Sequence, residues 1–314
     1  KGSREELPCG VKGQRPLGLL QNKGEVMFLA NTWEDYEVLD TGDGEKLERW
    51  GNVILRRPDP QTIWPKADPA LWKQAQAHYH RSEKGGGEWE FLTRLPERWT
   101  IQHQDLRFYV RPTGFKHTGL FPEQASNWDW FGKKIKDAVS SGREIKVLNL
   151  FAYTGGATLA AAAAGASVTH VDASKGMVTW AKENARSSGL GDAPIRWIVD
   201  DCVKFVEREI RRGNHYDAII MDPPSYGRGP KGEIWKIEEA IHPLIKLCAK
   251  LLSDKPLFFL VNSYTTGLAP AVLTYMLATE LAAFHGHVDS QEVGLPVSGN
   301  GLVLPCGASG RWEI

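Results

Sequence analysis

The amino-acid sequence predicts an α/β protein whose main sheet is mostly parallel. The first observation is that, from about residue 145 onward, short apolar runs alternate with longer stretches of helical periodicity. The second is that three successive apolar runs end in acidic residues, at Asp172, at Asp200 with Asp201, and at Asp222. In a parallel sheet the carboxyl ends of the strands share one edge, where open α/β sheets bind their ligands. The same pattern therefore predicts both the fold class and the position of a site.

Residues 1–112 lack this alternation, and they predict a smaller, β-rich N-terminal domain that could recognise a substrate. Short β-like runs are separated by turn sequences, such as residues 41–44 and 103–105, that are typical of hairpins. Residues 69–80 are predicted to form a short helix between these runs. Tryptophans are frequent in this region. They either stack on nucleic-acid bases or fill a β core that has few aliphatic side chains, and we expect the second.

The second region, residues 113–314, contains the alternating pattern. A helix is expected from Glu123, with apolar side chains at helical spacing as far as Val139. Strands are predicted at residues 145–151, 168–171, 195–199, 218–221 and 257–261, and helices at residues 157–164, 174–187, 203–212, 238–252 and 270–283. Residues 287–293 and the segment around 302–304 are expected to close the sheet as an antiparallel hairpin.

The connection after the first predicted strand suits a ligand that approaches the N-terminus of a helix. Strand residues 145–151 lead into Gly155 and Gly156, and an alanine-rich helix follows. A glycine turn of this kind exposes backbone N–H groups at the start of the helix. Asp172 lies 23 residues beyond Asn149, close to the spacing at which a βαβ unit binds a ribose hydroxyl.

The sequence Asp222-Pro223-Pro224-Ser225-Tyr226 follows an apolar run and predicts a rigid turn. Pro223 has no N–H and a fixed φ, so the sheet cannot continue, and Pro224 keeps its predecessor extended. A carboxylate, two prolines and a nearby aromatic ring suit the binding of a planar, polar group. By itself such a turn can also be a simple end to a strand, so its significance depends on the residues upstream.

Together these residues resemble the class I S-adenosylmethionine-dependent methyltransferases. Residues 149–156, Asn-Leu-Phe-Ala-Tyr-Thr-Gly-Gly, are most similar to the bacterial 23S ribosomal RNA methyltransferases, and the resemblance covers roughly residues 113–314. It implies a Rossmann-like sheet of seven strands with a reversed last strand. It also implies S-adenosyl-L-methionine as the cofactor, no metal, and ribosomal RNA as the acceptor. We therefore expect a methyltransferase.

The resemblance further implies which residues contact the two ligands. Residues 151–156 would border the methionine moiety, Asp172 would bind the ribose hydroxyls, and Asp201 with the Cys202 backbone would bind the adenine edge. Asp201 also suits the N-cap of the helix that follows it. The implied cofactor contacts are Thr118, Phe121, Gln124, Asn149, Phe151, Ala152, Tyr153, Thr154, Gly155, Gly156, Asp172, Ala173, Ser174, Asp201, Cys202 and Asp222. The implied catalytic residues, which face the acceptor, are Asp222, Pro223, Pro224 and Tyr226.

Methyl transfer from a sulfonium is an in-line displacement, so the acceptor atom must present a lone pair in the right position. An exocyclic amine would be oriented by hydrogen bonds from its N–H groups to Asp222 and to the Pro223 carbonyl. A ring carbon would instead need a cysteine nucleophile, but serine occupies both relevant positions, Ser225 and Ser263. We therefore expect a nitrogen or oxygen acceptor and no covalent adduct, with Cys306 as the cysteine that is hardest to exclude.

Other classes of function fit the residues less well. A nicotinamide dehydrogenase would share the fold and Asp172, but it needs a G-x-G-x-x-G turn, which Gly155-Gly156-Ala157 does not supply. A non-catalytic RNA-binding module is disfavoured because the cofactor set is intact. The net charge is zero, with 38 basic and 38 acidic residues, whereas an RNA-binding surface is expected to be basic. A methyltransferase acting on a protein or a small molecule therefore remains the alternative.

The composition predicts a cytoplasmic protein. The four cysteines show no C-x-x-C spacing, which indicates neither a zinc site nor a disulfide framework and suits a reducing compartment. No apolar segment approaches the length of a membrane span, and the N-terminus lacks a signal-peptide pattern, so no membrane partner is expected. The oligomeric state stays open, as does whether the start at Lys1 is native.

Overall fold

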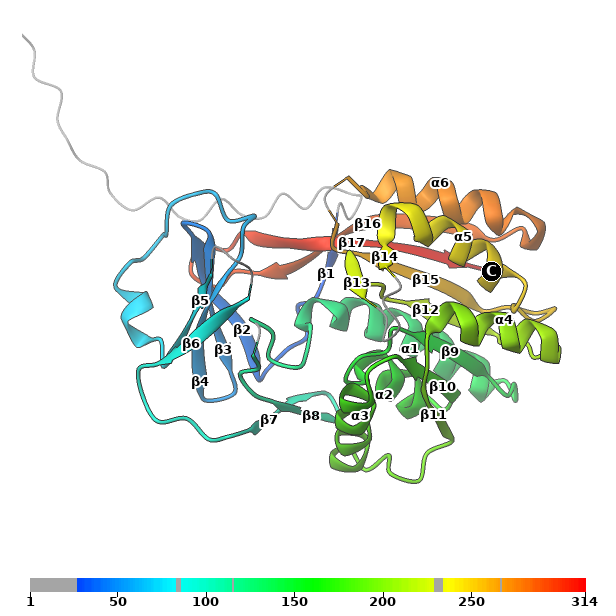
Figure 1. Cartoon of the computed structure of the whole chain (residues 1–314), viewed down its shortest axis with the longest axis horizontal. Coiled ribbons are helices and arrows are strands. Elements are labelled where there is room, and N and C mark those ends of the chain that lie inside the picture. The colour runs from blue at the N-terminus through cyan, green and yellow to red at the C-terminus, as the bar shows by residue number, and fades with distance from the viewer. Residues whose placement is uncertain (1–26, 83–85, 115, 229–233, 266) are drawn as a thin grey trace, which may run out of the picture.

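The computed structural model describes residues 27–82, 86–114, 116–228, 234–265 and 267–314. Figure 1 shows a β-rich unit at one end and, at the other, a larger sheet with helices on both faces. Within the described residues the larger sheet has eight strands, in the order β1-β16-β17-β15-β12-β9-β10-β11. β17 runs antiparallel to both of its neighbours, and the other pairs are parallel. The predicted fold class, a mostly parallel α/β sheet with a reversed strand and a β-rich N-terminal part, is confirmed.

The central parallel strands β9, β10, β12 and β15 are short and mostly buried on both faces, as expected for parallel strands covered by helices. All four side chains of the central strand β12 are buried. The strands are β1 (Met27–Leu29), β9 (Lys146–Leu150), β10 (Ser167–Asp172), β11 (Ile195–Val199), β12 (Ala218–Met221), β15 (Phe258–Ser263), β16 (His287–Pro296) and β17 (Val303–Glu313).

Two groups of helices cover the two faces of this sheet. The α-helices are α1 (Ala125–Ser140), α2 (Gly156–Ala163), α3 (Lys175–Ser187), α4 (Cys202–Arg212), α5 (Ile237–Ala249) and α6 (Pro270–Glu280). Side chains alternate along β9, so Val147 packs in the core with α1 and α2, whereas Leu148 and Leu150 pack in the core with α4, α5 and α6. Among the helices of the described residues, none combines the length and the apolar character that a membrane span needs.

The β-rich unit contains a twisted sheet and a separate hairpin. Its strands are β2 (Tyr36–Gly42), β3 (Glu45–Trp50), β4 (Val53–Pro58), β5 (Ala77–Arg81) and β6 (Gly87–Phe91), and the hairpin is β7 (Trp99–His103) with β8 (Leu106–Val110). Trp50 and Trp72 are buried, which fits tryptophans that fill a core. A second small hairpin, β13 (Tyr226–Arg228) with β14 (Ile234–Lys236), follows the Asp-Pro-Pro turn. The division of the chain at residues 112 and 113 stays a prediction.

Two local features differ from the sequence-based expectations. First, β1 comes from the N-terminal region and pairs with β16, which adds an eighth strand to the predicted seven. Second, the predicted helix over residues 69–80 is wrong, because a 3₁₀ turn (Leu71–Gln74) is followed directly by β5. Trp72 fixes this turn by donating its indole N–H to Asp40 Oδ2 at 2.8 Å. Pairing of β5 with β4 and β6 then outweighs local helix propensity.

A buried ionic cluster links the β-rich unit to the segment that precedes α1. Arg57 donates to both carboxylate oxygens of Glu48 at 2.6 and 2.7 Å. The Tyr36 hydroxyl also donates to Glu48, at 2.6 Å. Arg57 also donates to the Lys116 carbonyl at 2.9 Å. Burial alone would raise the pKa of Glu48, but Arg57 and Lys46 outweigh it and lower that pKa to about 2. The cluster is therefore ionised in the folded protein.

We expect Arg57→Met to lower the free energy of unfolding by about 3–5 kcal/mol, because it removes the bidentate partner of the buried Glu48 carboxylate and leaves only Lys46, at 3.6 Å, as a cationic partner among the described residues. Arg56→Met on the same strand is the matched control. Arg56 pairs with the half-buried Glu45, which keeps Lys66 and His78 as partners, so its loss should cost about 1 kcal/mol. Urea unfolding at pH 7, followed by tryptophan fluorescence, measures both variants.

The folded-state pKa of Glu48 lies below its unfolded value, so this carboxylate stabilises the fold above about pH 4.5. That contribution is lost as the pH falls toward 2. Equal losses of stability in the Arg57 and Arg56 variants at pH 7 would contradict the assignment of the buried cluster as the stronger interaction.

Candidate active site

The loop between β9 and α2 has an unusual backbone that places it against the end of β10. Phe151 and Tyr153 both have φ above +50°, and Gly155 has φ of 88°. Left-handed conformations at non-glycine residues are costly and concentrate at functional sites. Two hydrogen bonds hold the loop, from Ala152 N–H to the Val171 carbonyl at 3.0 Å and from Tyr153 N–H to Asp172 Oδ2 at 2.9 Å.

Asp172 ends β10 and connects this loop to the start of α3. One carboxylate oxygen accepts from Tyr153 N–H and the other from Ser174 N–H, at 2.9 and 2.8 Å. Burial raises the pKa of Asp172, and the two backbone N–H groups offset part of that rise. Each oxygen keeps a further lone pair with which it can accept a hydrogen bond from a ligand hydroxyl. Ala173 and Ser174 are exposed beside it.

Asp201 and Cys202 lie at the next strand end, where α4 begins. Asp201 is the N-cap of α4, and its side chain accepts from Lys204 N–H at 2.9 Å. This is the capping role that the sequence offered for Asp201 beside binding of the adenine edge. The Cys202 thiol is buried and accepts from Phe151 N–H at 3.3 Å. Burial raises the pKa of Cys202, so this thiol is neutral and serves the packing of the loop.

A narrow cavity of about 40 Å³ lies at the centre of these strand ends. Its lining includes Phe121, Gln124, Asn149, Phe151, Ala152, Tyr153, Thr154, Gly156, Asp222 and Asn262. The Asn149 amide donates to Thr158 Oγ1 at 2.9 Å and forms the inner wall. Nine of the predicted cofactor contacts therefore surround one cavity, which is wide enough for the small reacting end of a ligand.

The residues present fit S-adenosylmethionine. Thr118 Oγ1 is buried and has no hydrogen-bond partner among the described residues, and buried polar groups of this kind normally have one. The neighbouring Gly119 carbonyl accepts from Thr154 of the β9–α2 loop at 2.5 Å, so Thr118 lies beside that loop. A ligand with a ribose, an amino group and a carboxylate has the groups needed to form hydrogen bonds with both the Thr118 hydroxyl and the Asp172 carboxylate.

Asp222 follows β12 and lies at the acceptor side of the same cavity. Burial raises the pKa of its carboxyl to about 7, the nearby Glu123 carboxylate contributes to that rise, and a hydrogen bond from Asn262 opposes it. Burial likewise raises the pKa of Glu123. Two carboxyl groups that repel each other in this way readily hold or exchange a proton near neutral pH.

A buried network of amide side chains holds the partners of Asp222. Gln124 Oε1 accepts from Asn262 at 2.9 Å and from Asn127 at 2.8 Å. Ser309 donates to Asn262 Oδ1 at 2.7 Å, and Arg311 donates to Asn127 Oδ1 at 2.8 Å. The network thus connects the start of α1 to β15 and β17, and it fixes which face of Asn262 meets Asp222.

A larger cleft of about 580 Å³ opens next to the narrow cavity, and Leu120 and Phe121 line both. The β-rich unit contributes Lys46 and Arg57 to its wall, and the opposite side contributes Lys116, His117, Glu123, Tyr264 and Cys306. The Phe121 ring lies 5.6 Å from the rings of both Tyr153 and Tyr264. Aromatic rings and both signs of charge therefore meet in this cleft, whose lining also includes Asp59 and Glu292.

Not every predicted acceptor residue lies at this mouth. Pro223 is buried, whereas Pro224 and Tyr226 are exposed, and none of the three lines either cavity. Tyr264 is the tyrosine that lines the cleft, and Gln124 donates to its hydroxyl at 2.8 Å. Sequence reasoning missed Glu123, Asn262, Lys46 and Arg57 as site residues. Glu123 and Asn262 are sequence neighbours of residues that the sequence analysis had already placed at the site. The two cations come from the N-terminal region, where no local sequence pattern indicates a role in the site.

The described cysteines offer no reactive thiolate at the cleft. Cys306 lines it, but burial and nearby carboxylates raise the pKa of this thiol, which donates to the Leu304 carbonyl at 3.4 Å. Cys248 is fully buried within α5. Cys9 lies outside the described residues. These positions fit the expectation of an acceptor that is methylated without a covalent adduct.

Metal-ligating side chains do not gather at the strand ends in the part of the chain that the structure describes. One such group, His78, His80 and Glu90, lies on the β-rich sheet, with ligand atoms within 4.8 Å of one another. The expected absence of a metal stays a prediction.

Comparison with known proteins agrees with this geometry. The sequence profile of the family described as S-adenosylmethionine-dependent methyltransferase matches residues 65–286. A crystal structure of a SAM-dependent methyltransferase from Agrobacterium tumefaciens is 38% identical, with a TM-score of 0.87, and covers 92% of this chain and 93% of its own. A putative methyltransferase complexed with SAH shares the fold at 18% identity, with a TM-score of 0.71 over 90% of this chain and 76% of its own.

Curated relatives include ribosomal RNA large subunit methyltransferase K/L from Syntrophotalea carbinolica, 31% identical over 59% of this chain and 25% of the relative. Ribosomal RNA large subunit methyltransferase K from Neisseria meningitidis is 27% identical over 71% of this chain and 64% of the relative. The chain thus spans about a quarter of the K/L relative's length. The profile match over more than half of the chain, and the Agrobacterium structure over nearly all of it, give the same answer: the chain belongs to the family of S-adenosylmethionine-dependent methyltransferases.

Proposed function

We propose that this methyltransferase modifies a nitrogen, or an oxygen, on a base of large-subunit ribosomal RNA. The observation that carries the proposal is the Asp222 carboxyl, whose pKa lies near 7, in the wall of a narrow cavity that shares Leu120 and Phe121 with a larger, partly aromatic cleft. A planar base suits Phe121 and Tyr264, and a phosphate suits Lys116, because Lys46 and Arg57 are already paired with Glu48. The names of the curated relatives support the same substrate.

The chain's own residues would divide the chemistry between them. When bound, S-adenosylmethionine supplies a methyl group on a sulfonium, and S-adenosylhomocysteine leaves as the new bond to the acceptor forms. Asp222 accepts a hydrogen bond from the acceptor N–H, which aims the nitrogen lone pair, and it takes the proton that the nitrogen releases. Asn262 holds the Asp222 carboxyl in position, and Glu123 keeps its pKa near neutral. Asp172 binds the ribose, and the β9–α2 loop borders the methionine moiety.

A ribosomal RNA acceptor also favours the cytoplasm as the site of action, and we retain that expectation as part of the proposal. The competing acceptors are a protein or a small molecule. The cleft lining is as balanced in charge as the chain: its basic residues are Lys46, Arg57 and Lys116, and its acidic residues are Asp59, Glu123 and Glu292. The RNA proposal therefore depends on the aromatic lining and on the relatives rather than on charge.

The substrate is tested with ribosomal RNA from a strain that lacks the gene. We expect the purified enzyme to transfer a labelled methyl group to large-subunit RNA from this strain and not to the same RNA from the parent strain, where the position is already methylated. Mass spectrometry of nuclease digests then identifies the modified base. If the label appears only in the protein or small-molecule fraction of a lysate, the RNA proposal is wrong while the methyltransferase assignment stands.

Asp172→Asn should weaken binding of S-adenosylhomocysteine by about 10- to 100-fold, because a charged hydrogen bond to a ribose hydroxyl contributes about 1.5–3 kcal/mol. Asp254→Asn, in the loop before β15 at the opposite edge of the sheet, is the matched control and should bind normally. Titration calorimetry measures both. Wild-type affinity in the Asp172 variant would remove this carboxylate from the cofactor site.

Asp222→Asn should reduce methyl transfer by about 10²–10⁴-fold while changing the affinity for S-adenosylhomocysteine little. In the wild-type enzyme the single-turnover rate should rise with pH through an apparent pKa near 7, because the ionised carboxylate is the form that accepts the proton.

Glu123→Gln removes the neighbouring charge that raises the Asp222 pKa, so the midpoint of the pH–rate profile should move to lower pH. Glu292→Gln removes another carboxylate from the cleft wall that does not act on Asp222, and its profile should match the wild type. A profile that is flat in the wild type, or unmoved in the Glu123 variant, rules out Asp222 as the proton acceptor.

A further inference from the structure

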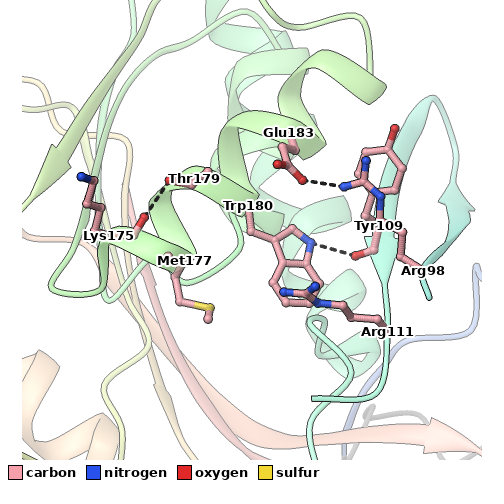
Figure 2. Close-up of a pocket in the computed structure, with 9 residues that line it drawn as sticks. Arg98, Tyr109, Arg111, Lys175, Met177, Thr179, Trp180 and Glu183 are labelled. Atoms are coloured by element: carbon pink, nitrogen blue, oxygen red, sulfur yellow. Dashed lines mark hydrogen bonds and ion pairs between the residues drawn. The ribbon is translucent and has the colours of Figure 1, made fainter. Parts of the chain in front are cut away.

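A third cavity, of about 480 Å³, lies between the first turns of α3 and the end of the β7–β8 hairpin. Figure 2 shows its lining: Arg98, Tyr109, Arg111, Lys175, Met177, Thr179, Trp180 and Glu183. None of these residues lines the cofactor cavity or the acceptor cleft. The lining contains three cations and one carboxylate, in a chain whose net charge is zero. A volume of this size accommodates a nucleotide-sized ligand.

Two of the cations are held in place by aromatic rings. The Arg111 guanidinium lies over the Trp180 ring, 4.8 Å from its centroid, and the Arg98 guanidinium lies over Tyr109 at 4.2 Å. Trp180 is itself fixed, because its indole N–H donates to the Tyr109 carbonyl at 3.0 Å. A guanidinium that is already ordered loses little freedom when it binds an anion.

Two of the cations also lack an ion-pair partner. Arg98 pairs with Glu183 at 2.7 Å and so neutralises the one carboxylate of the lining. Within the described ranges, neither Arg111 nor Lys175 forms a salt bridge. The cavity thus carries one ordered guanidinium beside Trp180 and, at its other end at the start of α3, one ammonium group, so the two cations lie well apart (Figure 2).

A short loop joins this cavity to the acceptor cleft. Arg111 N–H donates to the Thr118 carbonyl at 3.0 Å and closes the loop, which carries Lys116 and His117 into the cleft. Gly119 packs against the Trp180 ring, where a Cβ would lie 2.4 Å from Cζ2. Arg111 and Lys116 therefore lie five residues apart in the chain, one in the lining of the third cavity and the other in the lining of the cleft.

We propose that this cavity binds a nucleotide of the acceptor RNA that lies outside the methylated position, with Arg111 on its phosphate and Lys175, at the other end of the cavity, on a phosphate further along the strand. The inference rests on the proposed function. An RNA strand has a phosphate at every nucleotide, so it matches cations that are spaced apart, whereas a free nucleotide would need the cavity alone. The guanidinium face of Arg111 that points away from Trp180 is available for a base to stack on.

The test measures binding of a short fluorescein-labelled oligouridylate by the full chain at several salt concentrations. The Arg111→Gln/Lys175→Gln double variant should bind about tenfold more weakly or worse. The slope of its plot of log K against log salt should be smaller in magnitude by about one to two, the change expected when one or two phosphate contacts are lost. Lys182→Gln, which removes an exposed charge from the same helix outside the cavity, should match the wild type. S-adenosylhomocysteine affinity should be unchanged in all variants.

The single variant Lys175→Gln leaves the stack of Arg111 on Trp180 in place. It can therefore be measured even if the double variant does not fold. Wild-type affinity and salt slope in both cavity variants overturn the proposal, as does a wild-type enzyme that binds no oligouridylate. Binding of adenosine monophosphate that is lost in the variants, with oligouridylate binding unaffected, assigns the cavity to a free nucleotide instead. Methyl transfer to ribosomal RNA, measured separately, decides the proposed function, so the two can fail independently.

Discussion

The burial of the Asp222 carboxyl is the constraint on which the candidate site depends, because it raises the pKa of that group to about 7 against the opposing effect of Asn262. Asn262 is held in turn by Gln124 and Ser309, so the site draws on α1, β15 and β17 at once. Each amide in this network has its partners, and a satisfied buried network is rigid. The fold therefore keeps the acceptor carboxyl immobile while the ligands on either side exchange.

Much of the fold and half of the site could be predicted from the sequence, and the reason is geometric. Carboxyl ends of parallel strands meet at one edge, so Asp172, Asp201 and Asp222 had to lie together once the strands were recognised. The partners Glu123 and Asn262, and the cations Lys46 and Arg57, depend on how distant segments pack, for which a single sequence carries no local signal. The helix expected at residues 69–80 failed for the same reason, because Asp40 and the neighbouring strands determine that segment.

The neutral composition conceals a strongly uneven distribution of charge. Most acidic groups near the site are consumed locally: Glu48 by Arg57, Glu45 by Arg56, and Glu183 by Arg98. Among the described residues of the cleft and the third cavity, the basic residues that form no salt bridge are Lys116, Arg111 and Lys175. Net charge reports on solubility and long-range attraction, whereas a groove of a few residues decides what is bound locally. A chain with no net charge can thus still present cations that form no salt bridge.

The β-rich unit is attached to the larger sheet by more than its two ends. The turn between β16 and β17 pairs with β2, where Ser298 and Gly299 donate to the Val38 and Leu39 carbonyls, and one apolar core runs from Trp50 to Ile135. Domains joined through a continuous core do not swing apart as those on a flexible linker do. The cleft consequently has a nearly fixed width. For the proposed RNA acceptor, a base that is paired would have to leave its helix to enter, so the deformation would fall on the nucleic acid.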